Sequence, residues 1–240
     1  MPRRHQHGPT TQDTREIMFS IFRDADQLQN VEGQINDMLG SARRMFDLAA
    51  GALLMDQSPT EVSEEVWALD KQLNKTERSI RRELLIHGTV RGAEVDQGLM
   101  LVYMSITKDI ERIGDYCKNI WDLANLGVDL RSGSDADELK RHATEVADLL
   151  TEGAEAFINQ DSNAVHQLIP RIQALEAHFD EHVDTNLKSE KPGYVAAPRA
   201  LLFRHLKRIA SHSSNVLSSV VMPVDRLDFY KKSKAVEGQS

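Results

Sequence analysis

Two carboxylates one helical turn apart, Glu111 and Asp115, are the side chains of this 240-residue chain whose types and spacing most plainly suggest chemistry. They lie in the stretch 99–126, LMLVYMSITKDIERIGDYCKNIWDLANL, where apolar side chains recur every three to four residues. That period predicts one long amphipathic helix. Residues four apart lie one above the other on a helix, so both carboxylates can point at one place. The pair either binds a cation or belongs to an ordinary solvated helix face.

A second polar group is expected on the preceding helix, which we predict over residues 61–86. Asp70, Asn74 and Glu77 fall together there, away from the apolar stripe of that helix. Basic side chains accompany the first pair as well, since Arg112 and Lys118 lie in the same stretch as Glu111. These cations could neutralise the carboxylates without any metal, so both interpretations stay open.

The elements that must position these residues are helices throughout, and the fold class predicted is all-α. Aromatic residues make up only 5% of the chain and prolines number 7, a composition that does not favour strands. Turn-forming residues separate the periodic segments, most clearly at Arg131-Ser132-Gly133-Ser134-Asp135. The helices are expected over 14–57, 61–86, 93–126, 137–159, 162–187 and 199–221, with a polar break at 188–198. We therefore expect a disordered tail at 1–12, three-helix units at 13–130 and 135–232, and a second tail at 233–240.

Composition limits the class of protein. Apolar residues make up 40% of the chain, which is enough for a packed core, and the formal net charge is −8. An acidic chain of this kind lacks the basic face expected of a nucleic-acid binder. Neither a secretory signal nor a run of about 20 apolar residues is present in the sequence, and we expect a cytoplasmic protein. The single cysteine, Cys117, allows no intrachain disulfide, and we expect it to be a buried, inert thiol.

The last predicted helix repeats part of the 99–126 helix. The stretch HLKRIASHSSNVLSSVV, which begins at His205, aligns with DIERIGDYCKNIWDLAN, which begins at Asp109. Two amphipathic helices share an apolar period by chance, so matches outside the apolar stripe carry more weight. Arg112 and Asn119 lie outside that stripe and are matched by Arg208 and Asn215. This similarity predicts an internal repeat of two three-helix units.

The segment DIERIGDYCKNIWDLA closely resembles the signature of the PhoU family, in which a long helix carries E-R-I-G-D-H-x-x-N-I-A. The resemblance extends over nearly the whole chain, as two three-helix units with the signature in the third helix of each. It implies two tandem three-helix bundles and a regulatory, non-catalytic role in phosphate uptake. The partners that it implies are a phosphate transporter, through its cytoplasmic face or nucleotide-binding subunit, and a phosphate-sensing histidine kinase. A homodimer that meets through helix faces is also expected.

The resemblance further implies metal clusters held by paired (D/E)-x-x-x-D motifs. In the first unit the implied ligands are Glu111, Asp115, Asp70, Asn74 and Glu77, with Asn74 where the family prefers Asp. Such oxygen ligands suit Mg²⁺, Mn²⁺, Ca²⁺ or iron. Zinc is not favoured, because no cysteine or well-placed histidine belongs to this set. No organic cofactor is expected.

The second unit keeps only half of its implied site. Glu176 and Asp180 preserve the helix-two motif, but Lys207 and Ser211 stand where the first unit has Glu111 and Asp115. A lysine ammonium cannot act as a ligand. We therefore expect Lys207 to form a salt bridge with Glu176 or Asp180, and we expect any metal to bind in the first unit.

Two other classes of protein fit a helical bundle with paired carboxylates. A carboxylate-bridged di-iron enzyme would need Glu-x-x-His pairs, and the sequence contains none. A structural helical dimer that has lost its metal would show the same helices with no ligand. Oxygen consumption by the iron-loaded protein and elemental analysis separate these alternatives from a regulatory adaptor.

Overall fold

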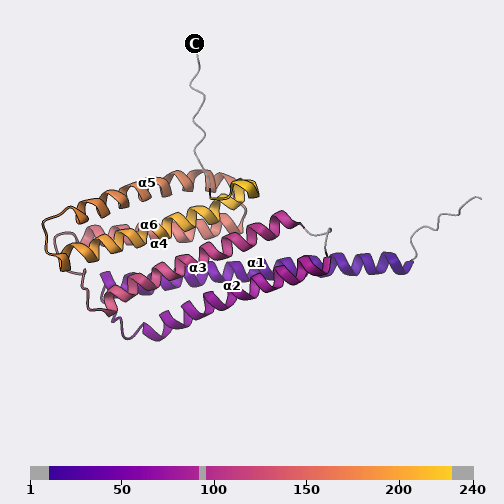
Figure 1. Ribbon diagram of the computed structural model, residues 1–240, viewed down its shortest axis with the longest axis horizontal. Helices are drawn as coiled ribbons and strands as arrows, with labels where there is room; N and C mark the ends of the chain where they lie inside the picture. The colour runs from indigo at the N-terminus through magenta and orange to yellow at the C-terminus, as the bar shows by residue number, and fades with distance from the viewer. Residues whose placement is uncertain (1–10, 92–95, 229–240) are drawn as a thin grey trace, which may run out of the picture.

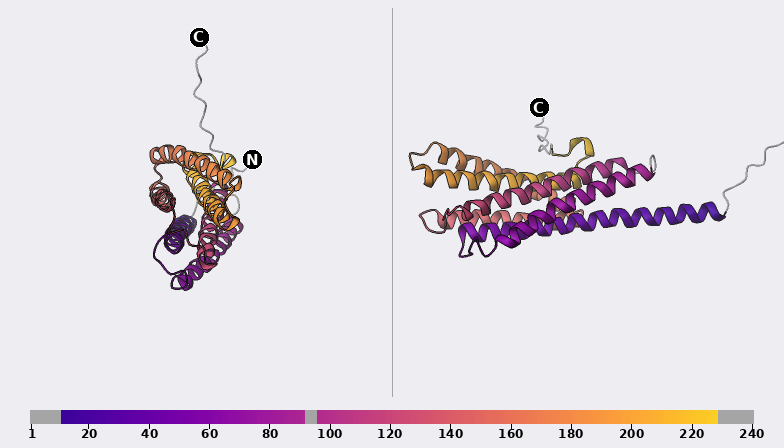
Figure 2. Two further views of the ribbon diagram at one scale, coloured as in Figure 1. Left: turned by 90° about the vertical axis from the view of Figure 1, so that its left-hand side faces the viewer. Right: turned by 60° about the horizontal axis from the view of Figure 1, so that its bottom comes forward.

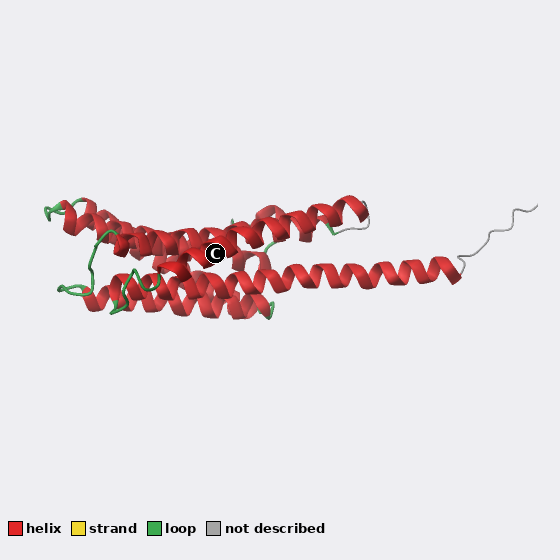
Figure 3. Ribbon diagram, turned by 90° about the horizontal axis from the view of Figure 1, so that it is seen from below, coloured by secondary structure: helices red, strands yellow, loops and turns green. Residues whose placement is uncertain are grey.

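The computed structural model of the chain describes residues 11–91 and 96–228, with side chains at 29–90 and 96–228. Six long helices and one short 3₁₀ helix make up these residues, with no strand among them, and the predicted all-α fold is confirmed (Figure 3). The elements are α1 (Thr11–Leu54), α2 (Ser63–Arg91), α3 (Gln97–Asn125), α4 (Ala136–Ile158), α5 (Ser162–Leu187), α6 (Gly193–Val221) and η2 (Val224–Arg226).

The helices form two three-helix bundles that lie side by side. In Figure 1, α1, α2 and α3 make the lower bundle and α4, α5 and α6 the upper one, with α1 extending beyond the other helices. Contacts of α1 with α4 and of α3 with α6 join the two bundles, and the end-on view in Figure 2 shows both in cross-section. One core of buried apolar side chains runs through both bundles, and a smaller one lies within the second. The two bundles therefore bury apolar surface against each other.

The apolar stripe of α3 is the centre of this packing. Ile106, Ile110 and Ile113 are each no more than 1% exposed, and Cys117 is fully buried. Burial in apolar surroundings raises the pKa of the Cys117 thiol, so the expected inert thiol agrees with the structure. The sequence period thus predicted correctly which side of α3 faces the core.

Local hydrogen bonds fix the ends of α3. The Asp96 carboxylate caps the start of the helix by accepting from the Leu99 N–H at 3.0 Å. At the other end Gly127 has a φ of +86°, a conformation that glycine adopts without a steric penalty. The next N–H, of Val128, then bonds back to the Leu123 carbonyl at 3.1 Å and closes the helix.

Two predicted boundaries differ by five residues or more, because α2 continues to Arg91 instead of ending at residue 86, and α6 begins at Gly193 rather than Arg199. The Pro192 carbonyl accepts from the N–H groups of Val195 and Ala196, which starts the helix six residues earlier than expected. Pro198 lies inside α6, where it removes the bond to the Tyr194 carbonyl. Tyr194 is 82% exposed, so solvent can satisfy that carbonyl, and the helix tolerates the proline.

The predicted tails lie largely outside the described residues, which begin at 11 and end at 228. The start that we expected for the third helix, near residue 93, also falls in an undescribed segment, 92–95. Within the described residues, no helix is both long and apolar enough to cross a membrane.

Candidate functional site

The two acidic groups predicted from the sequence face each other across α2 and α3. Glu77 and Glu111 are buried, at 4% and 5% exposure. Lys108 lies between them, with its Nζ 2.5 Å from Glu111 Oε2 and 3.6 Å from Glu77 Oε1. Arg81 adds a second cation 2.9 Å from Glu77 Oε1. The structure therefore joins Glu77 and Glu111 through a lysine that the sequence analysis did not single out.

Asp70 and Asp115 form the second part of this group. Arg112 lies 3.3 Å from Asp115 Oδ2, and Lys118 lies 3.4 Å from Asp70 Oδ1. Burial raises the pKa of Asp115, and the negative charges of Glu111 and Asp70 raise it further against the opposing effect of Arg112 and Lys108. The carboxylates of α2 and α3 are thus close enough to repel one another.

The predicted ligands do not converge on one point. Within the described part of the chain, no three of the carboxylates of Asp70, Glu77, Glu111 and Asp115 bring their oxygens within 4.8 Å of one another. The fifth member, Asn74, donates from Nδ2 to the Asp70 backbone carbonyl at 3.0 Å, which leaves its amide oxygen as the atom that could ligate. Basic side chains pair with all four carboxylates instead, and a metal at this position stays a prediction.

The residues nevertheless fit a hard cation. Glu77 Oε1 is buried and accepts no hydrogen bond, since Arg81 is near enough for an ion pair but is not aligned to donate. A buried carboxylate oxygen without a hydrogen bond is costly. A divalent cation would satisfy this oxygen and relieve the repulsion that raises the pKa of Asp115. The set therefore suits a metal, provided that Lys108 moves aside.

In the second bundle, Lys207 stands at the position that corresponds to Glu111 of the first. Lys207 of α6 forms a salt bridge with Asp180 of α5, as predicted. Glu176, the other carboxylate of that motif, lines a pocket of about 150 Å³ together with Ser211 and Ser214. A cation from the chain itself therefore occupies the position that corresponds to the predicted metal site of the first bundle.

A buried polar contact joins the two bundles where α3 meets α6. The Asp109 carboxylate accepts from His212 Nδ1 at 2.6 Å and from Asn215 Nδ2 at 3.0 Å. Arg208 donates to His212 Nε2 at 3.1 Å, so that ring is neutral, with its proton on Nδ1. His212 also stacks on Tyr116, with ring centroids 5.7 Å apart. Tyr116 and His212 are aligned with each other by the sequence repeat, so aligned positions meet at this interface.

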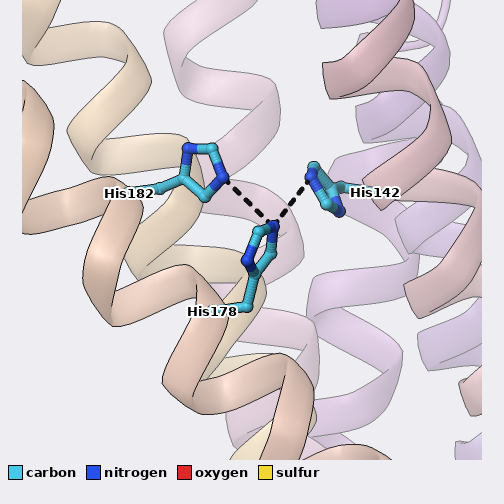
Figure 4. Close-up of side chains that lie close together, drawn as sticks. All are labelled: His142, His178 and His182. Carbon is cyan, nitrogen blue, oxygen red and sulfur yellow. Dashed lines mark hydrogen bonds between the residues drawn. The ribbon is translucent and has the colours of Figure 1, made fainter.

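Sequence reasoning missed a cluster of three histidines inside the second bundle. His142 of α4 lies beside His178 and His182 of α5, and the three Nε2 atoms point at one another (Figure 4). The available signal was spacing, because Glu138 and His142 are four residues apart, as are His178 and His182. Each pair therefore shares one helix face. Spacing alone could not show that these two faces meet.

Comparisons with known proteins agree with this architecture. The family model described as "PhoU domain" matches residues 35–124. A "Phosphate-specific transport system accessory protein PhoU homolog" of Synechocystis sp. is 25% identical over 198 residues, which cover 80% of this chain and 87% of the relative. The homologue of the same name from Deinococcus radiodurans is 27% identical over 210 residues, 82% of this chain and 93% of the relative. The crystal structure of PhoU from Pseudomonas aeruginosa has the same fold, with a TM-score of 0.70 at 21% identity over 82% of this chain and 96% of that one.

Proposed function

We propose that the chain is a member of the PhoU family and acts as a regulatory adaptor of phosphate uptake and of phosphate-dependent signalling. The observation that carries this proposal is the alignment with two relatives named as accessory proteins of phosphate-specific transport, over most of each chain. The motif that first suggested the family, Glu111 to Asp115, lies inside the matched PhoU domain.

The adaptor acts by protein–protein contact and without catalytic turnover. Long helix faces provide contact surface, and the sequence contains no glycine-rich phosphate loop of the kind that cradles nucleotides. On α2, Trp67, Leu85 and Ile86 are each more than half exposed, so apolar side chains are available to a partner. Exposed residues of this kind can also form the proposed homodimer.

The proposed partners are a phosphate transporter, through its cytoplasmic face or its nucleotide-binding subunit, and a phosphate-sensing histidine kinase. Such partners place the protein in the cytoplasm, at most peripheral to the membrane. The net charge of −8 argues against a direct role at nucleic acid.

We include a divalent metal or iron in this proposal. The residues that would hold it are Glu111, Asp115 and Asp70, with the amide oxygen of Asn74 and with Glu77 at the edge of the set. When bound, the cation would neutralise these carboxylates and link α2 to α3. The α2–α3 face would then differ between the metal-free and metal-bound protein, which gives the adaptor a means of regulation.

Affinity capture from cells tests the proposal. The tagged full-length chain is used as bait in phosphate-replete and phosphate-starved cells, with a helical protein of similar net charge as the control bait. We expect subunits of a phosphate transporter or a sensor kinase to be enriched, in amounts that change with phosphate supply. Specific recovery of partners unrelated to phosphate would contradict the proposed function and leave the fold unaffected.

A further inference from the structure

We propose that His142, His178 and His182 bind a Zn²⁺ ion, with Glu138 as the fourth ligand. This site lies between α4 and α5, apart from the acidic groups of α2 and α3. It also differs from the Glu176–Asp180 motif, because Asp180 pairs with Lys207 of α6. The inference therefore does not depend on the proposed function.

The spacing of the imidazole nitrogens matches a tetrahedral zinc site. His178 Nε2 lies 3.3 Å from His142 Nε2 and 3.1 Å from His182 Nε2, and all three ligand atoms lie within 4.8 Å of one another (Figure 4). Zinc–nitrogen bonds of 2.0–2.1 Å at tetrahedral angles place neighbouring ligand nitrogens about 3.3 Å apart. Both distances from His178 Nε2 therefore match a zinc site, and the ligand nitrogens of His142 and His182 lie within 4.8 Å of each other.

Hydrogen bonds between the histidines cannot account for this arrangement. An imidazole nitrogen has one position in the ring plane, which holds either a hydrogen or a lone pair. His178 Nε2 faces two nitrogens, so its contacts with His142 and His182 cannot both be ordinary hydrogen bonds. A cation that accepts one lone pair from each ring satisfies all three nitrogens at once.

Neighbouring carboxylates complete the site. Glu138 Oε1 lies 3.9 Å from His142 Nε2 and 3.8 Å from His182 Nε2 but outside the group of three nitrogens, and rotation of its exposed side chain would bring it to the fourth position. On the opposite side of its ring, His142 Nδ1 lies 3.0 Å from Glu145 Oε2. A carboxylate there holds the proton on Nδ1 and leaves the Nε2 lone pair for the metal, as is common for zinc-binding histidines.

The surroundings fix the rings and still admit an ion. His182 stacks on Phe203 at 4.2 Å between ring centroids, and His142 packs edge-on against Phe179 at 5.5 Å. His142 is 1% exposed, whereas the Glu138 side chain is 44% exposed, so the cluster is reached from the Glu138 side. Three imidazoles with one carboxylate suit Zn²⁺ better than the hard cations expected on α2 and α3.

Zinc binding by the full-length protein tests this assignment. Zn²⁺ affinity is measured by competition with a chromophoric chelator, and Co²⁺ replaces Zn²⁺ to report the geometry by its visible spectrum. We expect one tight site with the intense absorption of tetrahedral Co²⁺. His178→Gln and His182→Asn should each weaken binding by at least about 100-fold, and Glu145→Gln by about 10- to 100-fold. Zinc should also raise the Tm of the wild-type protein more than that of these variants.

The controls separate this site from others on the chain. His166→Gln removes a histidine of α5 outside the cluster, and Glu111→Ala alters the acidic site of the first bundle. Both variants should keep the tight Zn²⁺ site, and circular dichroism verifies that every variant is folded. Unchanged zinc affinity in folded His178→Gln, or an octahedral Co²⁺ spectrum, would overturn the assignment.

Discussion

The acidic residues of α2 and α3 already have cationic partners within the chain. Lys108 contacts both Glu77 and Glu111, and Arg112 and Lys118 pair with Asp115 and Asp70. Two of these partners were expected from the sequence, but Lys108 was not. A metal at this position would therefore compete with an internal ammonium group, and its affinity would depend on how easily Lys108 swings out.

Metal titration of matched glutamate variants tests the difference between the two bundles. Glu111→Ala removes a buried carboxylate of the first bundle, whereas Glu176→Ala removes a half-buried carboxylate of the second, where Lys207 already supplies a positive charge. With Mn²⁺ as the probe, we expect Glu111→Ala to weaken binding at least about 10-fold and Glu176→Ala to leave it unchanged. Calorimetric titration measures both affinities, and equal losses would show that the bundles do not differ in this way.

The helix α3 packs on α1, α2 and α6, so it contacts both the acidic residues of α2 and the second bundle. Its close approach to α2 depends on Gly114, in the middle of the E-R-I-G-D motif. A Cβ at that position would lie 2.4 Å from Leu73 Cδ1, and Leu73 is itself only 1% exposed. The motif glycine therefore sets the spacing between the two helices that carry the acidic residues.

A double-mutant cycle tests this role of Gly114. Alanine in a helix is favoured over glycine by about 1 kcal/mol, but overpacking a core costs about 1–3 kcal/mol. Gly114→Ala should therefore lower the free energy of unfolding by up to about 2 kcal/mol in the wild type and raise it by up to about 1 kcal/mol beside Leu73→Ala.

Chemical denaturation of the four proteins gives the coupling energy between the two positions. Gly40→Ala is the matched control, because nothing lies within 4 Å of a Cβ there and the substitution should simply stabilise α1. If Gly114→Ala has the same effect in both backgrounds, contact with Leu73 is not what the glycine avoids.

In the molecule as a whole, the two bundles meet through a shared apolar core and through hydrogen bonds between α3 and α6 and between α1 and α4. Asp109 of α3 binds His212 and Asn215 of α6, and Arg43 of α1 donates to the Ala147 carbonyl of α4 at 2.8 Å. Apolar packing holds the bundles together without strict direction, whereas the Asp109 hydrogen bonds select one register of α3 against α6.

Removing the Asp109 carboxylate tests how far this contact couples the bundles. Asp109→Ala leaves His212 and Asn215 without their acceptor, which should cost about 2 kcal/mol and lower the Tm by roughly 4–8 °C. Asp109→Asn keeps one acceptor oxygen and should cost less. Scanning calorimetry of both variants measures the effect, and a separate transition for each bundle in Asp109→Ala would show that Asp109 couples their unfolding. An unchanged Tm would assign the coupling to the apolar core and the remaining contacts between the bundles.

The sequence by itself predicted the helices, their buried faces and the resemblance to the PhoU family. Helical period is a local property, so the stripe of α3 and the helix α5, over Ser162–Leu187, could be predicted residue by residue. The start of α6 is different, because the backbone carbonyl of Pro192, rather than a capping side chain, accepts the first hydrogen bonds of this helix. A sequence pattern does not show such a bond, and the predicted start is therefore six residues too late.

Only the tertiary structure decided which polar faces meet. Spacing of four residues places two side chains on one side of a helix, but the angle and register of the neighbouring helix decide what lies opposite. Lys108 between Glu77 and Glu111, and His142 beside His178, both depend on that register. The sequence therefore predicted the acidic residues as a group, while the convergence of three histidines could be seen only once α4 and α5 were packed together.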